Sequence, residues 1–540
     1  MITSKKNIIS ALAVIACLML TLNLTAQGTG KLPRSTPEAE GVSSAGIVDF
    51  INAVDTGSVE LHSFMFIRHG KVIAEGWWAP FGPDYKHLLY SASKTFTATG
   101  IGLAVSENRL NISDKVISFF PYSLPDEISD YMKDLTVRNL LTMAVGQDPE
   151  PRSMGAGGDW IKTFIGSAPL YKPGSVFKYN NMATFMQSAI VQQVTGMTLF
   201  DYLKPRIFEP LGIRGIDWDL NPQGINLGMI GLRLRTEDLA KFGQLLMQNG
   251  MWDKKQLIPA AWVREATSFK IESSDPNNKT PQELNDWAQG YCYQMWRGRN
   301  NTVRLDGMAG QFVVLIPDKD AIVVFTANAR NTQHELNLMH DYLIPAIKSN
   351  KALPVDADTY NELLKMEAAL SLRTTASAKA DPAMASKVSG REFMIDDNDY
   401  KIQSLYFTFS KDGLNFTLKR DNRLTTTEAG PGSWKVQSSP LTSILAPPAT
   451  GTPSKSVDAN YTVPFSGAKV GASYAWTDDN TLELTARFVE ESIGPQTVVF
   501  RFSEMGGAVR VTIEPAAGGM MVPGFGPPQV RLRGTMVSIN

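Results

Sequence analysis

The stretch Tyr90-Ser91-Ala92-Ser93-Lys94-Thr95-Phe96-Thr97 stands at the start of a long amphipathic segment. On a helix, one inward-packing stripe would hold Ser91, Lys94, Ala98, Ile101 and Val105. A serine and a lysine therefore share a face that turns away from water. Burial of a lysine costs free energy unless a site uses its amine. The stretch predicts a reactive serine with a lysine base beside it.

The three-residue spacing alone does not single out a site, because two other pairs share it: Ser175/Lys178 and Ser466/Lys469. Ser175 falls in a predicted loop. Ser466 falls in a β-rich region, where residues three apart do not share a face. For Ser91 and Lys94 the alternative interpretation is a helix N-cap serine followed by a lysine whose amine reaches solvent.

The position of Lys94 has chemical value. Desolvation and the positive helix N-terminus both disfavour the ammonium form, so a neutral amine can accept the Ser91 proton. Backbone N–H groups at the same helix end can stabilise an oxyanion. The chain has no Gly-x-Ser-x-Gly elbow. Its five histidines fall in no recognisable metal or triad motif: His62, His69, His87, His334 and His340.

Two further segments carry groups that this chemistry needs. Tyr179-Asn180-Asn181 is the only Tyr-x-Asn of the chain and stands at a predicted loop-to-helix junction. A phenol whose pKa is lowered by a nearby lysine can shuttle protons to a leaving group, and an amide can orient the lysine and the substrate. The glycine-bearing stretch Leu305–Gln311 runs into a predicted strand, where a backbone N–H can approach a substrate carbonyl.

These segments resemble the serine beta-lactamase and penicillin-recognising superfamily, especially class C beta-lactamase-like esterases, D-aminopeptidases and 6-aminohexanoate-dimer hydrolases. The resemblance covers roughly residues 35 to 350, in family order. Its motifs are Tyr90 to Thr97, Tyr179-x-Asn181, Leu140-Leu141-Thr142-Met143, Gly231-Leu232-Arg233, Asp238-Leu239-Ala240-Lys241-Phe242-Gly243 and Ile316-Pro317-Asp318-Lys319-Asp320.

The resemblance implies Ser91 as the nucleophile that forms an acyl-enzyme. It implies Lys94 and Tyr179 as the coupled base and acid, Asn181 as a positioning group, and an oxyanion hole made by the N–H groups of Ser91 and Met308.

One position departs from the family pattern. Two residues before Gly307 the family carries Lys or His, and this chain has Leu305. Without that cation the predicted substrate is an ester or amide that lacks the carboxylate of a beta-lactam or D-Ala-D-Ala stem. Arg304 is a cation at the neighbouring position that could replace the missing one, so beta-lactams and peptides stay open as substrates.

The surrounding pattern predicts an α/β (α+β) protein. A hairpin is expected over 63–78, helices over 94–105, 137–143, 182–194, 236–247 and 260–266, strands over 288–296 and 311–328, and a closing helix over 334–347. This order favours a beta-lactamase/transpeptidase-like antiparallel sheet flanked by helices. The turn Lys411-Asp412-Gly413 and the alternating strands beyond it predict a C-terminal antiparallel β-barrel or sandwich. The expected plan is a signal peptide over 1–28, a hydrolase domain over 31–350, a linker with a short helix over 351–387 and a β-rich domain over 388–540.

Lys5 and Lys6 precede an uncharged, mostly apolar stretch, which predicts a secretory signal and a periplasmic location. Lipoprotein anchoring through Cys17 is less favoured, because apolar residues continue beyond it. Once Cys17 is removed, Cys292 has no disulfide partner and is expected to be a buried thiol. No later segment is long and apolar enough for a transmembrane span. With 52 basic and 53 acidic residues the chain has no charge excess that would recruit nucleic acid.

The leading hypothesis is therefore a secreted, metal- and cofactor-independent serine hydrolase that cleaves a small-molecule ester or amide through an acyl-enzyme on Ser91. The first alternative is a D,D-peptidase or beta-lactamase that acts on cell-wall peptides or beta-lactams. The second is a non-catalytic binding protein that retains the pocket, although a binder has no evident need for a buried lysine beside a serine. The substrate and the oligomeric state stay open.

Overall fold

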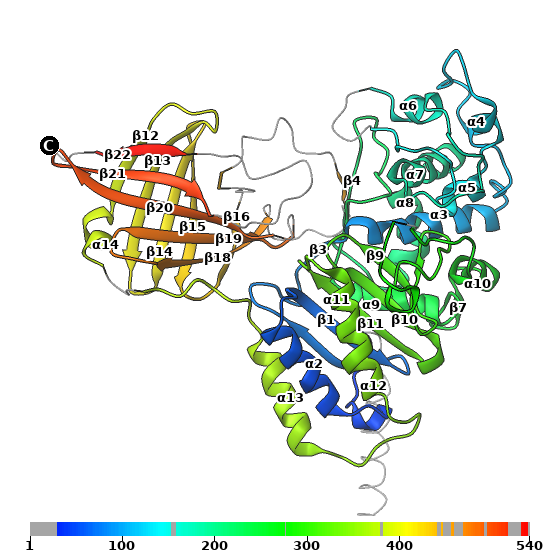
Figure 1. Cartoon of the computed structure of the whole chain (residues 1–540), viewed down its shortest axis with the longest axis horizontal. Coiled ribbons are helices and arrows are strands. Elements are labelled where there is room, and N and C mark those ends of the chain that lie inside the picture. The colour runs from blue at the N-terminus through cyan, green and yellow to red at the C-terminus, as the bar shows by residue number, and fades with distance from the viewer. Residues whose placement is uncertain are drawn as a thin grey trace, which may run out of the picture.

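A computed structural model describes residues 30–152, 158–275, 277–378, 382–439, 444–445, 455–457, 468–490, 494–516 and 531–537. Figure 1 shows a part in which helices cover a sheet and, beside it, a barrel built by the C-terminal strands. The predicted signal peptide and Ser466 lie outside the described residues. Within them, every helix is too short or too polar to span a bilayer.

The first sheet has six antiparallel strands in the order β2-β1-β11-β10-β9-β8. Their bounds are β1 Leu61–Arg68, β2 Lys71–Trp77, β8 Trp296–Arg297, β9 Val303–Gly307, β10 Gln311–Ile316 and β11 Ala321–Ala327. Strand β1 is buried along its whole length because its side chains alternate between two apolar layers. Phe64 and Phe66 face one layer, and Met65 and Ile67 face the other. Both faces of this sheet are therefore covered.

The layer on the Phe64 side is formed by α2 Ser44–Thr56, α11 Thr332–Leu338, η7 Met339–Leu343, α12 Ile344–Ala346 and α13 Ala357–Ala369. Helix α13 lies in the segment predicted as a linker. Leu363, Leu370 and Leu372 are nevertheless buried in the same apolar layer as Phe64. This part of the segment is docked on the sheet and is not a free tether.

The layer on the Met65 side is helical. It contains α3 Ser93–Ser106, α4 Asp130–Asp134, α5 Val137–Leu141, α6 Trp160–Gly166, α7 Asn181–Thr195, α8 Leu199–Leu203, η4 Lys204–Phe208, α9 Thr236–Met247 and α10 Ala260–Thr267. The predicted helices over these ranges are confirmed. The strand predicted over 288–296 is wrong except at its end, where Trp296 begins β8. Before Trp296 the only pairing in this stretch is at Tyr291, which forms isolated bridges with Ile271 and Trp296, and its aromatic residues Tyr291 and Tyr293 are buried in the core.

Short elements complete this part of the chain: η1 Glu38–Glu40, η3 Val116–Phe119, β6 Met251–Trp252, β7 Lys255–Gln256, η5 Gln282–Leu284 and η6 Pro317–Lys319. A separate small sheet has the strand order β17-β4-β5-β3. Its strands are β3 His87–Leu88, β4 Asp217–Asp219, β5 Leu232–Leu234 and β17 Lys455–Val457. Because β17 comes from the C-terminal region, this sheet joins that region to the segment that precedes Ser91.

The C-terminal strands form a closed nine-stranded β-barrel and not a sandwich. Around the barrel run β15 Arg423–Pro431, β14 Gly413–Arg420, β13 Ile402–Ser410, β12 Arg391–Ile395, β22 Leu532–Met536, β21 Ala508–Pro515, β20 Gln496–Met505, β19 Thr481–Phe488 and β18 Ala468–Trp476, with β16 Lys435–Ser439 added beside β18. Closure is made by a short parallel pairing of β15 with β18, so the barrel is antiparallel except at this seam. Helix α14 Ala383–Val388 packs against its core.

The barrel interior is filled by aromatic side chains. The Phe407 ring lies 5.1 Å from the Phe500 ring and 5.6 Å from the Phe416 ring, centroid to centroid. Aromatic edge and face contacts of this kind stabilise a packed core beyond the area that they bury. The barrel thus has its own hydrophobic core.

Candidate active site

Ser91 lies in a single 3₁₀ turn, η2 Tyr90–Ala92, between strand β3 and helix α3. The Leu89 N–H donates to the Leu232 carbonyl at 3.0 Å, which ties the start of the turn to β5. Tyr90 has a φ of 47°, in the left-handed region that a tyrosine rarely adopts. The turn leaves the Ser91 side chain half-buried, while Ala92, Ser93 and the helix that follows are buried.

Lys94 is the second residue of α3 and is 1% exposed. Its Nζ lies 2.9 Å from Ser91 Oγ, 2.9 Å from Asn181 Oδ1 and 3.0 Å from the Met229 carbonyl oxygen. The amide and carbonyl oxygens can only accept, so the amine donates to both. A neutral amine then keeps its lone pair for the Ser91 hydroxyl proton. This geometry suits Lys94 to act as a base toward Ser91.

Burial lowers the pKa of Lys94 to about 7, from an ordinary value of 10.5. The carboxylates of Glu150 and Asp306 act in the opposite direction, because negative charge favours the ammonium form. A base whose pKa lies close to neutrality is present in both protonation states at neutral pH. It can therefore take and return a proton in one reaction cycle.

The Tyr179 ring lies on the other side of the amine, with Lys94 Nζ 4.9 Å from the ring centroid. Part of the ring is exposed, and its hydroxyl contacts Ser91. Burial around the hydroxyl raises the pKa of Tyr179 well above its usual value, and the contact with Ser91, which lowers this pKa, is outweighed. The expectation that lysine lowers this pKa is therefore wrong, since burial of the hydroxyl is the dominant effect. At neutral pH Tyr179 is a phenol that can donate a proton.

Asn181 begins α7, and its side chain is held by a carboxylate that the sequence analysis did not identify. Asn181 Nδ2 donates to Glu150 Oε1 at 3.0 Å, and the Asn181 backbone N–H donates to Glu150 Oε2. A carboxylate is favoured at this place because it faces the positive end of a helix. With its amide nitrogen fixed in this way, Asn181 presents its oxygen to Lys94. Glu150 lies 31 residues before Asn181 in the chain, and no local motif marks it.

Gly307 and Met308 lie where β9 ends beside the nucleophile turn. A Cβ on Gly307 would stand 2.3 Å from the Leu89 carbonyl oxygen, so glycine is needed for this approach of two backbones. Met308 is 39% exposed. Ala309 and Gly310 follow with φ values of 61° and 93°, and they turn the chain into β10. The Met308 backbone thereby follows directly on a residue that packs against the segment before Ser91.

The side chains of Leu305 and Arg304 point into the protein. Leu305 is fully buried in the helical-side core. Arg304 is 1% exposed; its Nε donates to Asp306 Oδ2 at 2.9 Å and its Nη1 donates to the Asp286 carbonyl at 2.9 Å. The charge of Arg304 is thus matched by Asp306, whose own pKa burial raises. Neither side chain extends a cation toward Ser91.

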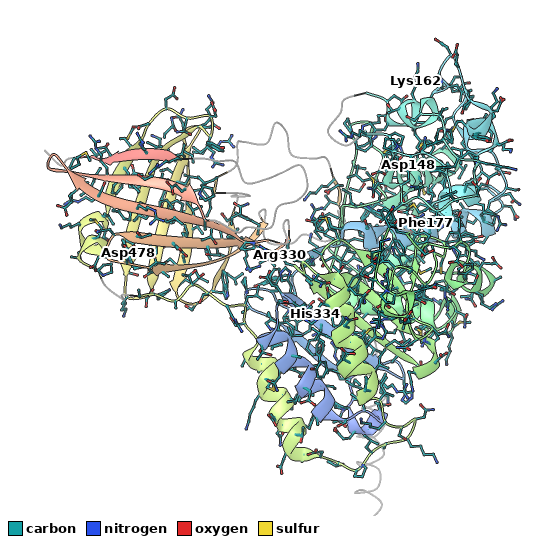
Figure 2. All side chains as sticks on the ribbon, in the orientation of Figure 1. Asp148, Lys162, Phe177, Arg330, His334 and Asp478 are labelled. Carbon is teal, nitrogen blue, oxygen red and sulfur yellow. The ribbon has the colours of Figure 1, made fainter. Side chains whose placement is uncertain are left out.

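Aromatic side chains form one wall beside this group. The Tyr179 and Trp296 rings are stacked with centroids 6.1 Å apart, and Phe177 meets Trp296 edge-on at 5.3 Å. Phe177 and Asp148 belong to the helical side of the sheet, while His334 lies on α11 (Figure 2). The wall offers an apolar surface next to the Ser91 hydroxyl.

The other sequence candidates lie elsewhere or have other partners. Ser175 Oγ donates to the Lys172 carbonyl, while the Lys178 amine pairs with Asp148 at 2.8 Å, so this serine and lysine do not form a dyad. Burial raises the pKa of the Cys292 thiol to about 12, which fits a buried, unreactive cysteine. Among the described residues no cluster of three His, Cys, Asp or Glu side chains is arranged to hold a metal ion.

This fold, with the Ser91, Lys94 and Tyr179 side chains gathered at the start of α3, defines the class of beta-lactamase-like proteins. The chain belongs to the Beta-lactamase family, whose model matches residues 53–345.

Three comparisons illustrate the relationship. A 6-aminohexanoate-dimer hydrolase from Paenarthrobacter ureafaciens is 23% identical over 281 residues, which cover 48% of this chain and 71% of the relative. Protein flp from Staphylococcus aureus (strain MW2) is 23% identical over 173 residues, or 29% of this chain and 34% of that protein, so the match spans about a third of its length. The crystal structure of a penicillin-binding protein homologue from Caulobacter crescentus has 18% identity and a TM-score of 0.42, covering 54% of this chain and 92% of that one.

Proposed function

We propose that the protein is a serine hydrolase that cleaves an ester or amide through an acyl-enzyme on Ser91. The observation that carries this proposal is the buried Lys94 amine, which lies 2.9 Å from Ser91 Oγ while Asn181 and Met229 occupy its N–H groups. A structural lysine would place its charge in water. Here the amine is directed at a hydroxyl that is itself accessible.

In the proposed reaction, neutral Lys94 takes the Ser91 proton as Oγ attacks the substrate carbonyl. The oxyanion that forms faces the N–H groups of Ser91 and Met308. When the tetrahedral intermediate collapses, the leaving alcohol or amine takes a proton from the Tyr179 phenol, which regains one from Lys94. Water then attacks the acyl-enzyme, giving one proton to the same pair, and Ser91 is restored with release of the acid.

The proposed substrate is neutral near the scissile bond. Glu150 and Asp306 both act on Lys94 as negative charges, and the nearby cation Arg304 is paired with Asp306. A substrate carboxylate would enter this site without a partner, which costs free energy. A D,D-peptidase or beta-lactamase activity is the second candidate, because the match to the Beta-lactamase family favours it.

We also propose the domain plan given above, with export directed by residues 1–28 and the hydrolytic groups confined to residues 31–350.

The apolar wall formed by Phe177, Tyr179 and Trp296 supports a substrate whose acyl or leaving group is apolar or aromatic.

A fluorophosphonate probe tests the proposed mechanism. The wild type should be labelled on Ser91, as shown by mass spectrometry of the modified peptide. Ser91→Ala should lose labelling and ester hydrolysis while keeping its melting temperature, because Ser91 contributes little to the core. Ser175→Ala is the matched control and should change neither. Full hydrolysis by Ser91→Ala would exclude the mechanism. A panel of p-nitrophenyl esters, D-amino acid amides and a chromogenic cephalosporin then separates the two candidate functions.

A further inference from the structure

A chain of polar contacts between buried and half-buried side chains runs from the barrel to the segment that carries Ser91, and the proposed reaction does not use it. It begins at Arg487 on β19, which is 5% exposed. Arg487 Nη1 and Nη2 donate to the two oxygens of Glu60 at 2.9 and 2.8 Å. A paired contact of this kind fixes orientation as well as charge.

From Glu60 the contacts continue through two histidines. Glu60 Oε1 lies 3.2 Å from His62 Nε2, and His62 Nδ1 lies 2.8 Å from His87 Nε2. His87 Nδ1 lies 3.1 Å from the Leu88 carbonyl oxygen. Both rings are buried, and His62 stacks on Phe81 with centroids 3.7 Å apart. His87 and Leu88 are the two residues of β3, and the nucleophile turn follows directly.

A second contact from the barrel reaches the same place. Glu490, two residues beyond β19, accepts from the Lys86 N–H with its Oε1 at 3.2 Å. Its backbone carbonyl accepts from Arg233 Nε at 3.1 Å. Lys86 precedes β3, and Arg233 pairs with Leu88 across β3 and β5. The stretch 487–490 therefore contacts both the segment that leads to the turn and its partner strand β5, with Val489 buried in the apolar layer between these contacts.

These contacts end at a segment that needs outside support. Strand β3 has two residues, His87 and Leu88, which pair with β5, and the Leu89 N–H adds one further bond to Leu232. Tyr90, just beyond it, holds a left-handed φ of 47°. A residue in such a conformation persists only where its surroundings fix it. The position of Ser91 relative to Lys94 thus depends on how firmly residues 86–89 are anchored.

We propose that Arg487 and Glu490 are positioning residues, through which the barrel holds the β3 segment and so sets the placement of Ser91 for attack. The inference rests on the proposed hydrolase function for its kinetic consequence, but not for its structural one. It gives the barrel a role in the site although it supplies no group to the reaction.

The test uses the full-length chain and begins with Arg487→Met, Glu490→Ala and, as matched control, Arg510→Met. Arg510 is an exposed arginine of β21 whose contact is with Met505. The first readout is hydrogen exchange of peptides covering 84–92. We expect faster exchange in Arg487→Met and Glu490→Ala and no change in Arg510→Met, at equal far-ultraviolet circular dichroism.

The second readout is the rate of fluorophosphonate labelling of Ser91 together with kcat/KM for a p-nitrophenyl ester. Both should fall by about tenfold or more in Arg487→Met and Glu490→Ala, since small displacements of a reacting group have effects of this size. Glu490→Gln, which keeps an acceptor oxygen, should restore most of the rate. The double variant Glu60→Gln/Arg487→Met should lose little more rate than Glu60→Gln alone, because both residues act through one chain of contacts.

Unchanged exchange in both variants would overturn the proposal, and so would faster exchange with labelling within twofold of the wild type. Additive losses in the double variant would overturn the route through Glu60. If the wild type itself is not labelled, the proposed function fails, while the exchange data still decide whether the barrel anchors residues 86–89. Should Arg487→Met fail to fold, Glu490→Ala and its Gln counterpart give the same decision.

Discussion

Two opposing effects act on the Lys94 amine. Burial in the core removes water and disfavours the charged form, while Glu150 and Asp306 favour it. The balance leaves the pKa near neutrality, and the three contacts of Nζ fit both forms. As an ammonium group it donates to Ser91, Asn181 and Met229, and as an amine it accepts from Ser91. The residue that costs stability is thus the one that the proposed chemistry requires.

The rate of acylation should follow the protonation of Lys94. Because the neutral amine is the base and its pKa is about 7, kcat/KM should rise with pH up to about 7 and level off above it. Below that value it should fall tenfold per pH unit. In Glu150→Gln a negative charge that raises this pKa is lost, so the midpoint should move to lower pH. Asp148→Asn, which removes an exposed carboxylate paired with Lys178, is the control. A midpoint that Glu150→Gln does not move would contradict the assignment of Lys94.

Substrate charge should matter at the same site. Leu305 is buried in the core and Arg304 is paired with Asp306, so a carboxylate beside the scissile bond has no cation to meet. We expect neutral esters to have a kcat/KM about tenfold or more above that of matched esters carrying a carboxylate, since one missing charge-assisted contact is worth roughly 1.5 kcal/mol. Comparison of a methyl-terminated and a carboxylate-terminated p-nitrophenyl ester of equal chain length measures this. A cephalosporin hydrolysed faster than any neutral ester would favour the beta-lactamase alternative.

The sequence was informative about this site where function is local in the chain. Ser91 and Lys94 are one helical turn apart, so periodicity alone placed them on one face. Tyr179 and Asn181 were identified from the Tyr-x-Asn motif. Glu150 could not be predicted, because its contact with Asn181 depends on tertiary packing. The predicted lowering of the Tyr179 pKa was wrong for a related reason, since the shift depends on how deeply the folded chain buries the hydroxyl.

At the scale of elements, the end of β9 and the turn η2 approach each other through backbone alone. Gly307 lies so close to the Leu89 carbonyl oxygen that a Cβ at this position would stand only 2.3 Å from it. Helices such as α3 and α7 were predictable because each is a long run that contains no proline and is bounded by turns or loops, although both are buried on all sides over most of their length. The stretch 288–296 was not, because before Trp296 it pairs only through isolated bridges at Tyr291, and a run of buried aromatic residues has the same sequence pattern with or without a continuous strand.

Gly307→Ala should separate these two elements. The new Cβ would stand 2.3 Å from a backbone oxygen that has no rotamer to change, so β9 or η2 must shift and the Met308 N–H must move with it. We expect kcat/KM to fall by about 10² or more, the usual effect of losing one oxyanion donor. Gly166→Ala, whose Cβ would meet nothing closer than 4.0 Å, should retain full activity. Wild-type turnover by Gly307→Ala would remove Met308 from the proposed oxyanion hole.

At the scale of the whole molecule, buried residues connect the barrel with the six-stranded sheet. Val489 from the barrel side lies in the apolar layer that contains Phe64 and Leu372. Strand β17 extends the small sheet beside β4, and Arg487 pairs with Glu60. Two bodies predicted from composition as separate domains are therefore coupled through contacts that composition does not reveal. Such coupling is distinct from the barrel's ability to form its own core.

This coupling predicts how the chain unfolds. Burial would raise the pKa of Glu60, but the contacts with His62 and Arg487 outweigh it and hold the pKa below its ordinary value of 4.5. A carboxyl group with a lowered folded-state pKa stabilises the fold above that ordinary value, and the stabilisation is lost progressively as the pH falls below it.

At pH 7 calorimetry should therefore show one transition, with equal calorimetric and van't Hoff enthalpies. Below pH 4.5 the barrel and the part built on the six-stranded sheet should begin to unfold separately. Glu60→Gln should show the divided transition already at pH 7, because its side chain cannot carry the charge that Arg487 meets. Two resolved transitions in the wild type at pH 7 would mean that the interface transmits little free energy, and the barrel would then be an independent module.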